Sequence, residues 1–217
     1  MTSIEDTFVE TSAVFLQLFS EENMFLPTIT ILCEGASEMK YVQAVNRLMI
    51  RPERYPIPFK PFCLGNGDLP TIKARLKTFP GKERSSVKVW VDQDLYCQGR
   101  KWHIAYSNTK GLQNFLFSCM NFEDFLVTHC SDDAFNEWLK FCNRQNHFLN
   151  PMPECTYLPA FQSIFPNYQK GDLPFELTCD RLENMFKHVG KQAGQISNGF
   201  GEFLKSEVIA GNLTFLS

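Results

Sequence analysis

Long hydrophobic runs are missing from this chain of 217 residues. No apolar run approaches the roughly 20 residues that a membrane-spanning helix needs. The first residues, Met1 to Asp6, lack the basic region of a secretory signal. Internal repeats and low-complexity tracts are also missing. We therefore expect a cytoplasmic globular protein that has no membrane among its partners.

Two common site motifs are missing as well. The chain contains no GxxxxGK[ST] loop, so we expect no intrinsic ATPase activity. Its eight cysteines include no CxxC pair, and several lie within apolar runs, which indicates reduced, buried thiols rather than a disulfide framework or a zinc site. Cys130, Cys142 and His147 could be assembled into a zinc set, but their spacing matches no familiar zinc motif.

The overall composition is ordinary, but the charge is unevenly placed. Hydrophobic residues make up 44% and charged residues 21%, as in other globular proteins, and the 21 phenylalanines fit core and interface packing better than base stacking. From Arg47 to Lys101, 12 Lys and Arg face five Asp and Glu, whereas the rest of the chain is acidic. This basic region either holds phosphates, with Lys88 and Lys101 as candidate substrate-binding residues, or is a solvated face.

Strand and helix patterns alternate along most of the chain. Apolar or β-branched runs predict strands at 28–33, 61–64, 87–91 and 114–118. Amphipathic patterns predict helices that begin near Ser37 and cover 69–79, 122–130 and 132–141. This alternation predicts an α/β domain with a mostly parallel central sheet flanked by helices.

The two ends of the chain have less regular patterns. Residues 1–24 predict an amphipathic helix, and a short helix is expected at 101–107. Residues 143–175 have no clear period and read as an ordered insertion or loop. A helix is expected at 179–192, and a last helix or strand at 201–216. We expect an N-terminal helix (1–24), a catalytic core (25–142) and a helical, loop-rich C-terminal elaboration packed on that core (143–217).

Acidic residues follow two of the predicted strands. Glu34 comes directly after the first strand, and Asp92 and Asp94 end the third. The carboxyl ends of parallel strands share one edge of a sheet, so these side chains are expected to meet there. Carboxylate oxygens suit Mg²⁺ or Mn²⁺, and Glu34 could ligate the ion or act as general acid or base. Glu38 could support this site or merely favour the helix N-terminus. The alternative for all of these residues is that they are ordinary acids in loops without a functional role.

Four motifs resemble those of a known family. The residues from Glu34 to Tyr41 (EGASEMKY) and from Asp92 to Asp94 (DQD) resemble the acidic motifs of the TOPRIM domain. More narrowly, those from Ser118 to His129 (SCMNFEDFLVTH) and from Tyr168 to Gly171 (YQKG) resemble the RloB-like family of bacterial antiphage defence proteins. Together the motifs span residues 28–171 in the family's order.

The resemblance implies a TOPRIM-like fold and Mg²⁺-dependent cleavage of phosphodiester bonds. It makes Glu34 the general acid or base, Asp92 and Asp94 the metal ligands, and Glu123 a further site acid. Glu123 could instead serve only the dipole of its helix. Lys170 could bind phosphate or be a surface lysine. His129 fits a packed, hydrogen-bonded histidine better than a catalytic one.

The leading hypothesis is a cytoplasmic nuclease that cleaves DNA or RNA, tRNA included, as the toxic effector of a defence system. The family also implies a protein partner, an ABC- or SMC-like ATPase. The first alternative is a catalytically inactive TOPRIM-like module that binds and regulates such an ATPase. The second is another phosphotransfer enzyme that uses the same acids, such as a primase-like polymerase.

Overall fold

The computed structural model describes residues 28–51, 58–81, 86–93, 114–118, 120–191 and 199–216. The helices expected at 1–24 and 101–107 lie outside these residues, as do Asp94 and Lys101.

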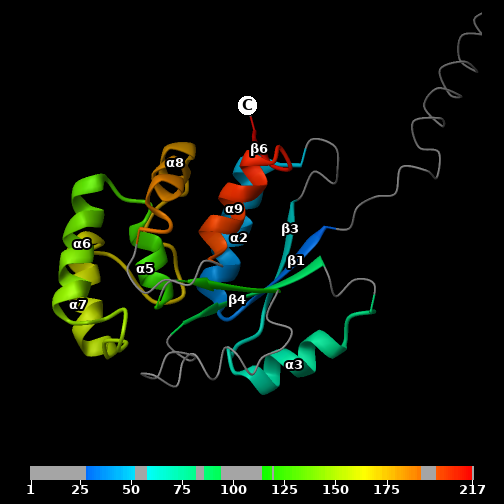
Figure 1. Ribbon diagram of the computed structural model, residues 1–217, viewed down its shortest axis with the longest axis horizontal. Coiled ribbons are helices and arrows are strands. Elements are labelled where there is room, and N and C mark those ends of the chain that lie inside the picture. The colour runs from blue at the N-terminus through cyan, green and yellow to red at the C-terminus, as the bar shows by residue number, and fades with distance from the viewer. Residues whose placement is uncertain are drawn as a thin grey trace, which may run out of the picture.

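The centre of the fold is a four-stranded parallel sheet (Figure 1). Its strands are β1 (Ile29–Cys33), β3 (Phe59–Cys63), β4 (Val87–Asp92) and β5 (Phe115–Ser118), in the order β3-β1-β4-β5. The last three residues of β1 and residues 89–91 of β4 are all buried, as expected for inner strands whose two faces are covered. The predicted α/β class with a mostly parallel sheet is confirmed.

Helices cover both faces of this sheet. Helices α2 (Ala36–Leu48) and α9 (Phe200–Ile209) lie on one side, and α3 (Leu69–Lys77) lies on the other (Figure 1). On the α2 and α9 side, the indole of Trp90 stacks on the ring of Phe200, with centroids 4.0 Å apart and planes 7° apart. The last helix of the chain therefore packs directly on the central strand of the sheet.

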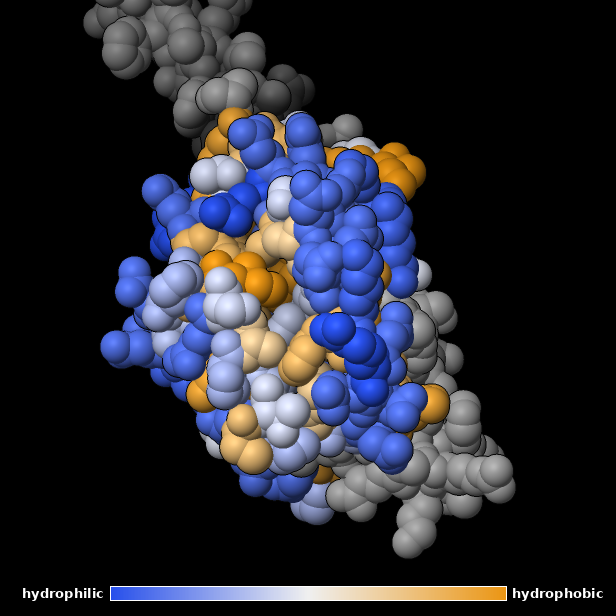
Figure 2. Space-filling view, turned by 90° about the vertical axis from the view of Figure 1, so that its left-hand side faces the viewer, coloured by the Kyte–Doolittle hydropathy of each residue, from blue (hydrophilic) through white to orange (hydrophobic). Residues whose placement is uncertain are grey.

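A helical layer lies beside the sheet and contains α5 (Phe122–Val127), α6 (Asp132–Arg144), α7 (Glu154–Ile164) and α8 (Cys179–His188). The face that this layer forms is shown in Figure 2, where hydrophobic side chains lie in separate patches among hydrophilic ones. Among the described residues, no helix is both long and apolar enough to cross a membrane.

Helix α7 corrects the expectation of an irregular segment at 143–175. Pro159 lies inside this helix and interrupts the sequence pattern, because proline usually breaks helices. In the fold Pro159 is exposed, whereas Tyr157 and Phe161, four residues apart, are buried on the same face. Tertiary packing of these two rings thus outweighs the helix-breaking tendency of Pro159.

Several boundaries also differ from the predicted ones. Helix α2 has Gly35 as its N-cap residue instead of beginning near Ser37, and α8 ends at His188 rather than at residue 192. The end of the chain contains both a helix and a strand, because α9 is followed by β6 (Thr214–Phe215), which pairs antiparallel with β2 (Met49–Ile50).

Candidate active site at the carboxyl edge of the sheet

Glu34 lies directly beyond the end of β1. Its backbone N–H donates to the carbonyl of Trp90 at 3.0 Å, which continues the pairing of β1 with β4. Its Oε2 accepts a hydrogen bond from the backbone N–H of Asp92 at 3.0 Å. The side chain of Glu34 is therefore held across the carboxyl ends of the two central strands.

Gly67 leaves room for this carboxylate. A methyl carbon placed on Gly67 would lie only 2.5 Å from the carboxyl carbon of Glu34, so any side chain here would push Glu34 away. The sequence pattern indicated only a turn at this glycine. The loop between β3 and α3 thus forms one wall of the Glu34 position.

Glu38 occupies a buried position one helical turn after Glu34. Its carboxylate accepts a hydrogen bond from the backbone N–H of Gly35 at 3.1 Å, and its side chain is 5% exposed. Burial, together with the smaller effect of the negative charges of Glu34 and Glu123, raises the pKa of Glu38 from 4.5 to about 7. Three carboxylates from two segments far apart in the sequence thus act on one another.

Glu123, in the first turn of α5, is also buried. The Tyr168 hydroxyl donates a hydrogen bond to its Oε1 at 2.8 Å. Burial raises the pKa of Glu123, and this effect is partly offset by the Tyr168 hydrogen bond and by the positive charge of Lys170. The YQKG segment therefore orientates the carboxylate of Glu123 through Tyr168. The sequence alone had indicated no role for this tyrosine.

Asp92 ends β4, where it is half-buried, and Ser118 is its partner in the register of β5. Residues paired in this way on neighbouring parallel strands point to the same face of the sheet. The Ser118 hydroxyl is buried and makes no hydrogen bond with any residue that the structure describes. A polar oxygen in this position is one that a ligand or water at the site would satisfy.

The predicted cations do not all reach this edge. Lys170 Nζ donates to Glu154 at 2.6 Å, and its charge acts on Glu123, so it lies near the site. Lys88 lies near the opposite end of β4, with Nζ 5.8 Å from the ring centroid of Phe203 in α9. The candidate Lys101 lies outside the described residues.

His129 belongs to the core rather than to the acids. Its Nε2 lies 2.7 Å from the Tyr41 hydroxyl, and its Nδ1 faces the carbonyls of Phe125 and Leu126. Two carbonyls at Nδ1 require that this nitrogen carries the proton, so Nε2 accepts from Tyr41. Burial lowers the pKa of His129 to about 3, which leaves a neutral packed histidine.

A second group of potential metal ligands lies beneath the helical layer. Asp124, Cys142 and His147 are all buried, with ligand atoms within 4.8 Å of one another. The zinc set considered from the sequence contained Cys130 in place of Asp124. Among the described residues, four groups donate hydrogen bonds to the carboxylate of Asp124. They are the His147 ring and the Trp138 indole at 2.8 Å each, the Asn121 backbone N–H at 3.2 Å, and the Cys142 thiol at 3.8 Å.

The hydrogen bonds of His147 favour a structural role for this group. Its Nδ1 accepts from the backbone N–H of Met152 at 2.9 Å, so Nε2 must carry the ring proton and donate it to Asp124. A metal at Nε2 would require the proton on Nδ1, where it would face the N–H of Met152. We therefore interpret this group as a buried hydrogen-bond network, which we call the Asp124 network.

The fold thus brings together the acids that the sequence singled out, as far as the structure describes them. Glu34, Glu38, Asp92 and Glu123 gather at one edge of the sheet. Gly67, Ser118 and Tyr168 were missed as contributors, although Ser118 and Tyr168 both lie within recognised motifs. No family model, curated protein or solved structure matches this chain.

Proposed function

We propose that this protein is a metal-dependent nuclease of the TOPRIM type, which cleaves phosphodiester bonds in DNA or RNA. The observation that supports this proposal is the meeting of Glu34, Glu38, Glu123 and Asp92 at the carboxyl edge of a parallel sheet. Such edges are where α/β folds place their ligands. Buried carboxylates with raised pKa values are typical of catalytic rather than structural acids.

The donor set of the site fits a hard divalent cation. Glu34 and Asp92 would hold the ion, together with Asp94, and the buried Ser118 hydroxyl offers a further oxygen beside Asp92. When bound, Mg²⁺ or Mn²⁺ would polarise the phosphodiester and lower the pKa of water. The mutual repulsion of the carboxylates in the protein alone also fits a cation site.

The other side chains have roles that follow from their contacts. Glu38 has a pKa of about 7, so it can hold or release a proton near neutral pH, as a general acid or base must. Tyr168 orientates Glu123 through its hydroxyl. The charge of Lys170 is near enough to lower the pKa of Glu123 and could also attract a phosphate.

The biological role follows from the resemblance of the four motifs. We propose a toxic effector of an antiphage system that acts on nucleic acid in the cytoplasm and is controlled by an ABC- or SMC-like ATPase. The separate hydrophobic patches of the helical layer are available for such a partner (Figure 2). Genetic pairing with an ATPase and co-purification would support this part of the proposal.

The decisive experiment incubates the purified chain, alone and with a co-expressed ATPase partner, with labelled tRNA, single-stranded RNA and duplex DNA in Mg²⁺ or Mn²⁺. We expect cleavage that EDTA abolishes and that falls at least about 100-fold in Glu34→Gln and Asp92→Asn, since each removes a charged ligand. The Gly67→Ala variant should also lose activity, because its methyl group displaces Glu34.

Asp133→Asn is the matched control, since Asp133 is an exposed acid on α6. The control should cleave as the wild type does. Equal cleavage by wild type, Glu34→Gln and Asp92→Asn would overturn the assignment of these acids. Cleavage of none of the substrates under any of these conditions, together with no Mg²⁺ binding by calorimetry, would favour the inactive module that regulates an ATPase.

A further inference from the structure

Strand β3 and helix α3 carry a concentration of positive charge. Lys60 lies on β3, and Lys73, Arg75 and Lys77 lie on α3, all with exposed side chains. Strand β3 is an outer strand of the four-stranded sheet. Within the described part of the chain, Lys60, Lys73 and Arg75 form no ion pair, although seven ion pairs occur elsewhere. Their charge is therefore not neutralised by any carboxylate that the structure describes.

The one acid of this segment that the structure describes, Asp68, has a local task. It is the N-cap residue of α3, and its carboxylate accepts hydrogen bonds from the Thr71 backbone N–H at 2.8 Å and from the Thr71 hydroxyl at 2.9 Å. Its charge is directed at the start of the helix, where it stabilises the helix dipole. The exposed surface of β3 and α3 thus remains strongly basic.

Aromatic rings hold the most central of these cations in place. The guanidinium carbon of Arg75 lies 5.4 Å from the ring centroid of Phe62 and 5.9 Å from that of Phe79. Lys60 Nζ lies 5.4 Å from the centroid of Phe62. These contacts limit the movement of the Arg75 fork and leave its N–H groups available for an anion such as phosphate.

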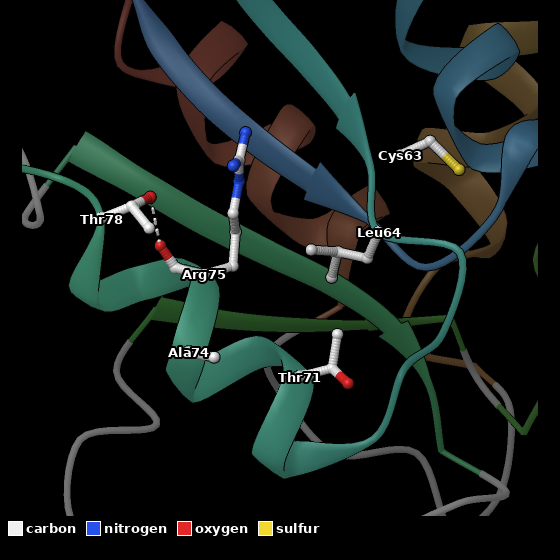
Figure 3. Close-up of a pocket in the computed structure, with 6 residues that line it drawn as sticks. All are labelled: Cys63, Leu64, Thr71, Ala74, Arg75 and Thr78. Carbon is white, nitrogen blue, oxygen red and sulfur yellow. Dashed lines mark hydrogen bonds between the residues drawn. The ribbon is translucent and has the colours of Figure 1, made fainter.

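A hollow of about 470 Å³ adjoins this surface (Figure 3). It is lined by the end of β3 and by one side of α3, through Cys63, Leu64, Thr71, Ala74, Arg75 and Thr78. Figure 3 shows the Arg75 side chain extending from α3 toward the strands. A hollow of this volume is of the size that accommodates a small ligand such as one nucleotide, but it is too small for a duplex.

The hollow is connected to the acids by a short stretch of chain. The backbone N–H of Leu64, which lines the hollow, donates to the carbonyl of Cys33 at 2.8 Å, directly before Glu34. Three residues later, Gly67 packs against the carboxylate of Glu34. A single strand of nucleic acid that lies in the hollow would therefore continue toward the carboxyl edge of the sheet.

We propose that the surface of β3 and α3 around Arg75 is the docking site for a single-stranded segment of nucleic acid. This inference rests on the proposed nuclease function and names the part of the chain that holds the substrate. The cations bind the phosphates, and the Arg75 fork, supported by Phe62 and Phe79, binds the phosphate or the base that enters the hollow.

The test measures binding without cleavage. Fluorescence anisotropy with labelled single-stranded RNA, single-stranded DNA and duplex DNA is recorded on the full chain that carries Glu34→Gln, in EDTA. Adding Lys60→Gln and Arg75→Gln should weaken single-strand binding at least about 10-fold, and the salt dependence of log Kd should fall by about 1.4, because two phosphate contacts are lost. Circular dichroism establishes that the variants fold.

The matched control replaces Lys140 and Arg144, exposed cations of α6, by glutamine and should leave binding unchanged. The inference is overturned if both pairs of substitutions have the same effect, if duplex DNA binds more tightly than single strands, or if nothing binds. Cleavage by the wild type with binding independent of Arg75 would overturn the docking site alone. Binding that depends on Arg75 without cleavage would overturn the nuclease function alone.

Discussion

Glu123 and Asp124 are neighbours on α5, both buried, yet their surroundings are opposite. Asp124 accepts hydrogen bonds from four donors of its own chain. For Glu123 the side-chain donor is Tyr168, and the acids Glu38 and Asp124 lie near enough for their charges to act on it. The carboxylate of Asp124 is therefore stabilised by hydrogen bonds within the fold, whereas that of Glu123 also faces the charges of other acids.

This contrast separates an acid whose lone pairs are satisfied by protein donors from the acids for which we propose a ligand. A buried carboxylate offers about four lone-pair positions, and Asp124 fills its positions with protein donors. At the carboxyl edge of the sheet, burial and, to a smaller extent, repulsion by the neighbouring acids raise the pKa of Glu38 instead. A cation would relieve that repulsion, but it would find no open position at Asp124.

The largest effect is expected at the Asp124 network. In Asp124→Ala, the His147 and Trp138 donors lose a buried acceptor, which should lower the free energy of unfolding by about 3–5 kcal/mol. Urea unfolding followed by circular dichroism measures this change. The control is Glu123→Gln, at the next residue of the same helix, which should unfold at the wild-type urea concentration or above it.

A metal role for the Asp124 network would give a different result. Its ligands would then bind Zn²⁺ in the wild type, and Cys142→Ser would lower stability only when Zn²⁺ is present. We expect Cys142→Ser to have the same small effect with Zn²⁺ and with EDTA, because the thiol is one donor among four. Zinc analysis of the purified protein provides an independent check.

The second effect concerns Glu38, where removal of the charge should stabilise the folded protein instead of destabilising it. Its pKa in the fold, about 7, lies above the value of 4.5 outside it, so the folded state binds a proton more tightly. Stability should therefore fall as pH rises from about 4.5 to about 7, by up to about 3 kcal/mol. In EDTA at pH 8, Glu38→Gln should unfold at a higher temperature than the wild type.

Melting in the presence of Mg²⁺ tests whether a cation relieves the repulsion among these acids. The ion should raise the melting temperature of the wild type at pH 8, because it neutralises the repelling carboxylates. It should raise that of Asp92→Asn much less. If Glu38→Gln and the wild type melt together across pH 4 to 8, then burial and the neighbouring acids do not raise the pKa of Glu38 as the structure indicates.

The sheet could be predicted from the sequence, because its strands carry strong local signals. The runs before Glu34 and Asp92 are apolar and end abruptly in acids, and parallel topology then places those acids at one edge. Helix α7 could not be predicted, since Pro159 interrupts its helical sequence pattern and the helix is stabilised by tertiary packing. Local propensity predicts an element well only where packing does not override it.

The site could be predicted only in part, for a related reason. The acids were recognisable because residue type and strand position determine their chemistry. The contributions of Gly67 and Ser118 depend on which distant side chain lies opposite, and neither residue type indicates a partner. The distinct roles of Glu123 and Asp124 depend in the same way on donors from α6 and from the segments that follow it.

The smallest effect is expected at Asp132. It tests whether hydrogen-bond donors to an exposed carboxylate stabilise the protein as much as donors to the buried Asp124. Its carboxylate accepts hydrogen bonds from Lys187 at 2.5 Å and from His188 Nε2 at 2.7 Å, and these lower its pKa from 3.8 to about 2. A lowered pKa means that the stabilisation is complete above about pH 4 and is lost as pH falls through about 2. Asp132→Asn should therefore lower the melting temperature slightly at pH 7 and by much less at pH 2.

Asp133→Asn, at the next position in the first turn of α6, is the control for the helix dipole, since Asp133 is exposed as well. Because water screens the charges at Asp132, its effect should exceed that of Asp133→Asn only slightly and remain far below that of Asp124→Ala. If Asp132→Asn destabilised the protein as much as Asp124→Ala, then the number of donors, and not their burial, would set the stability that a carboxylate provides.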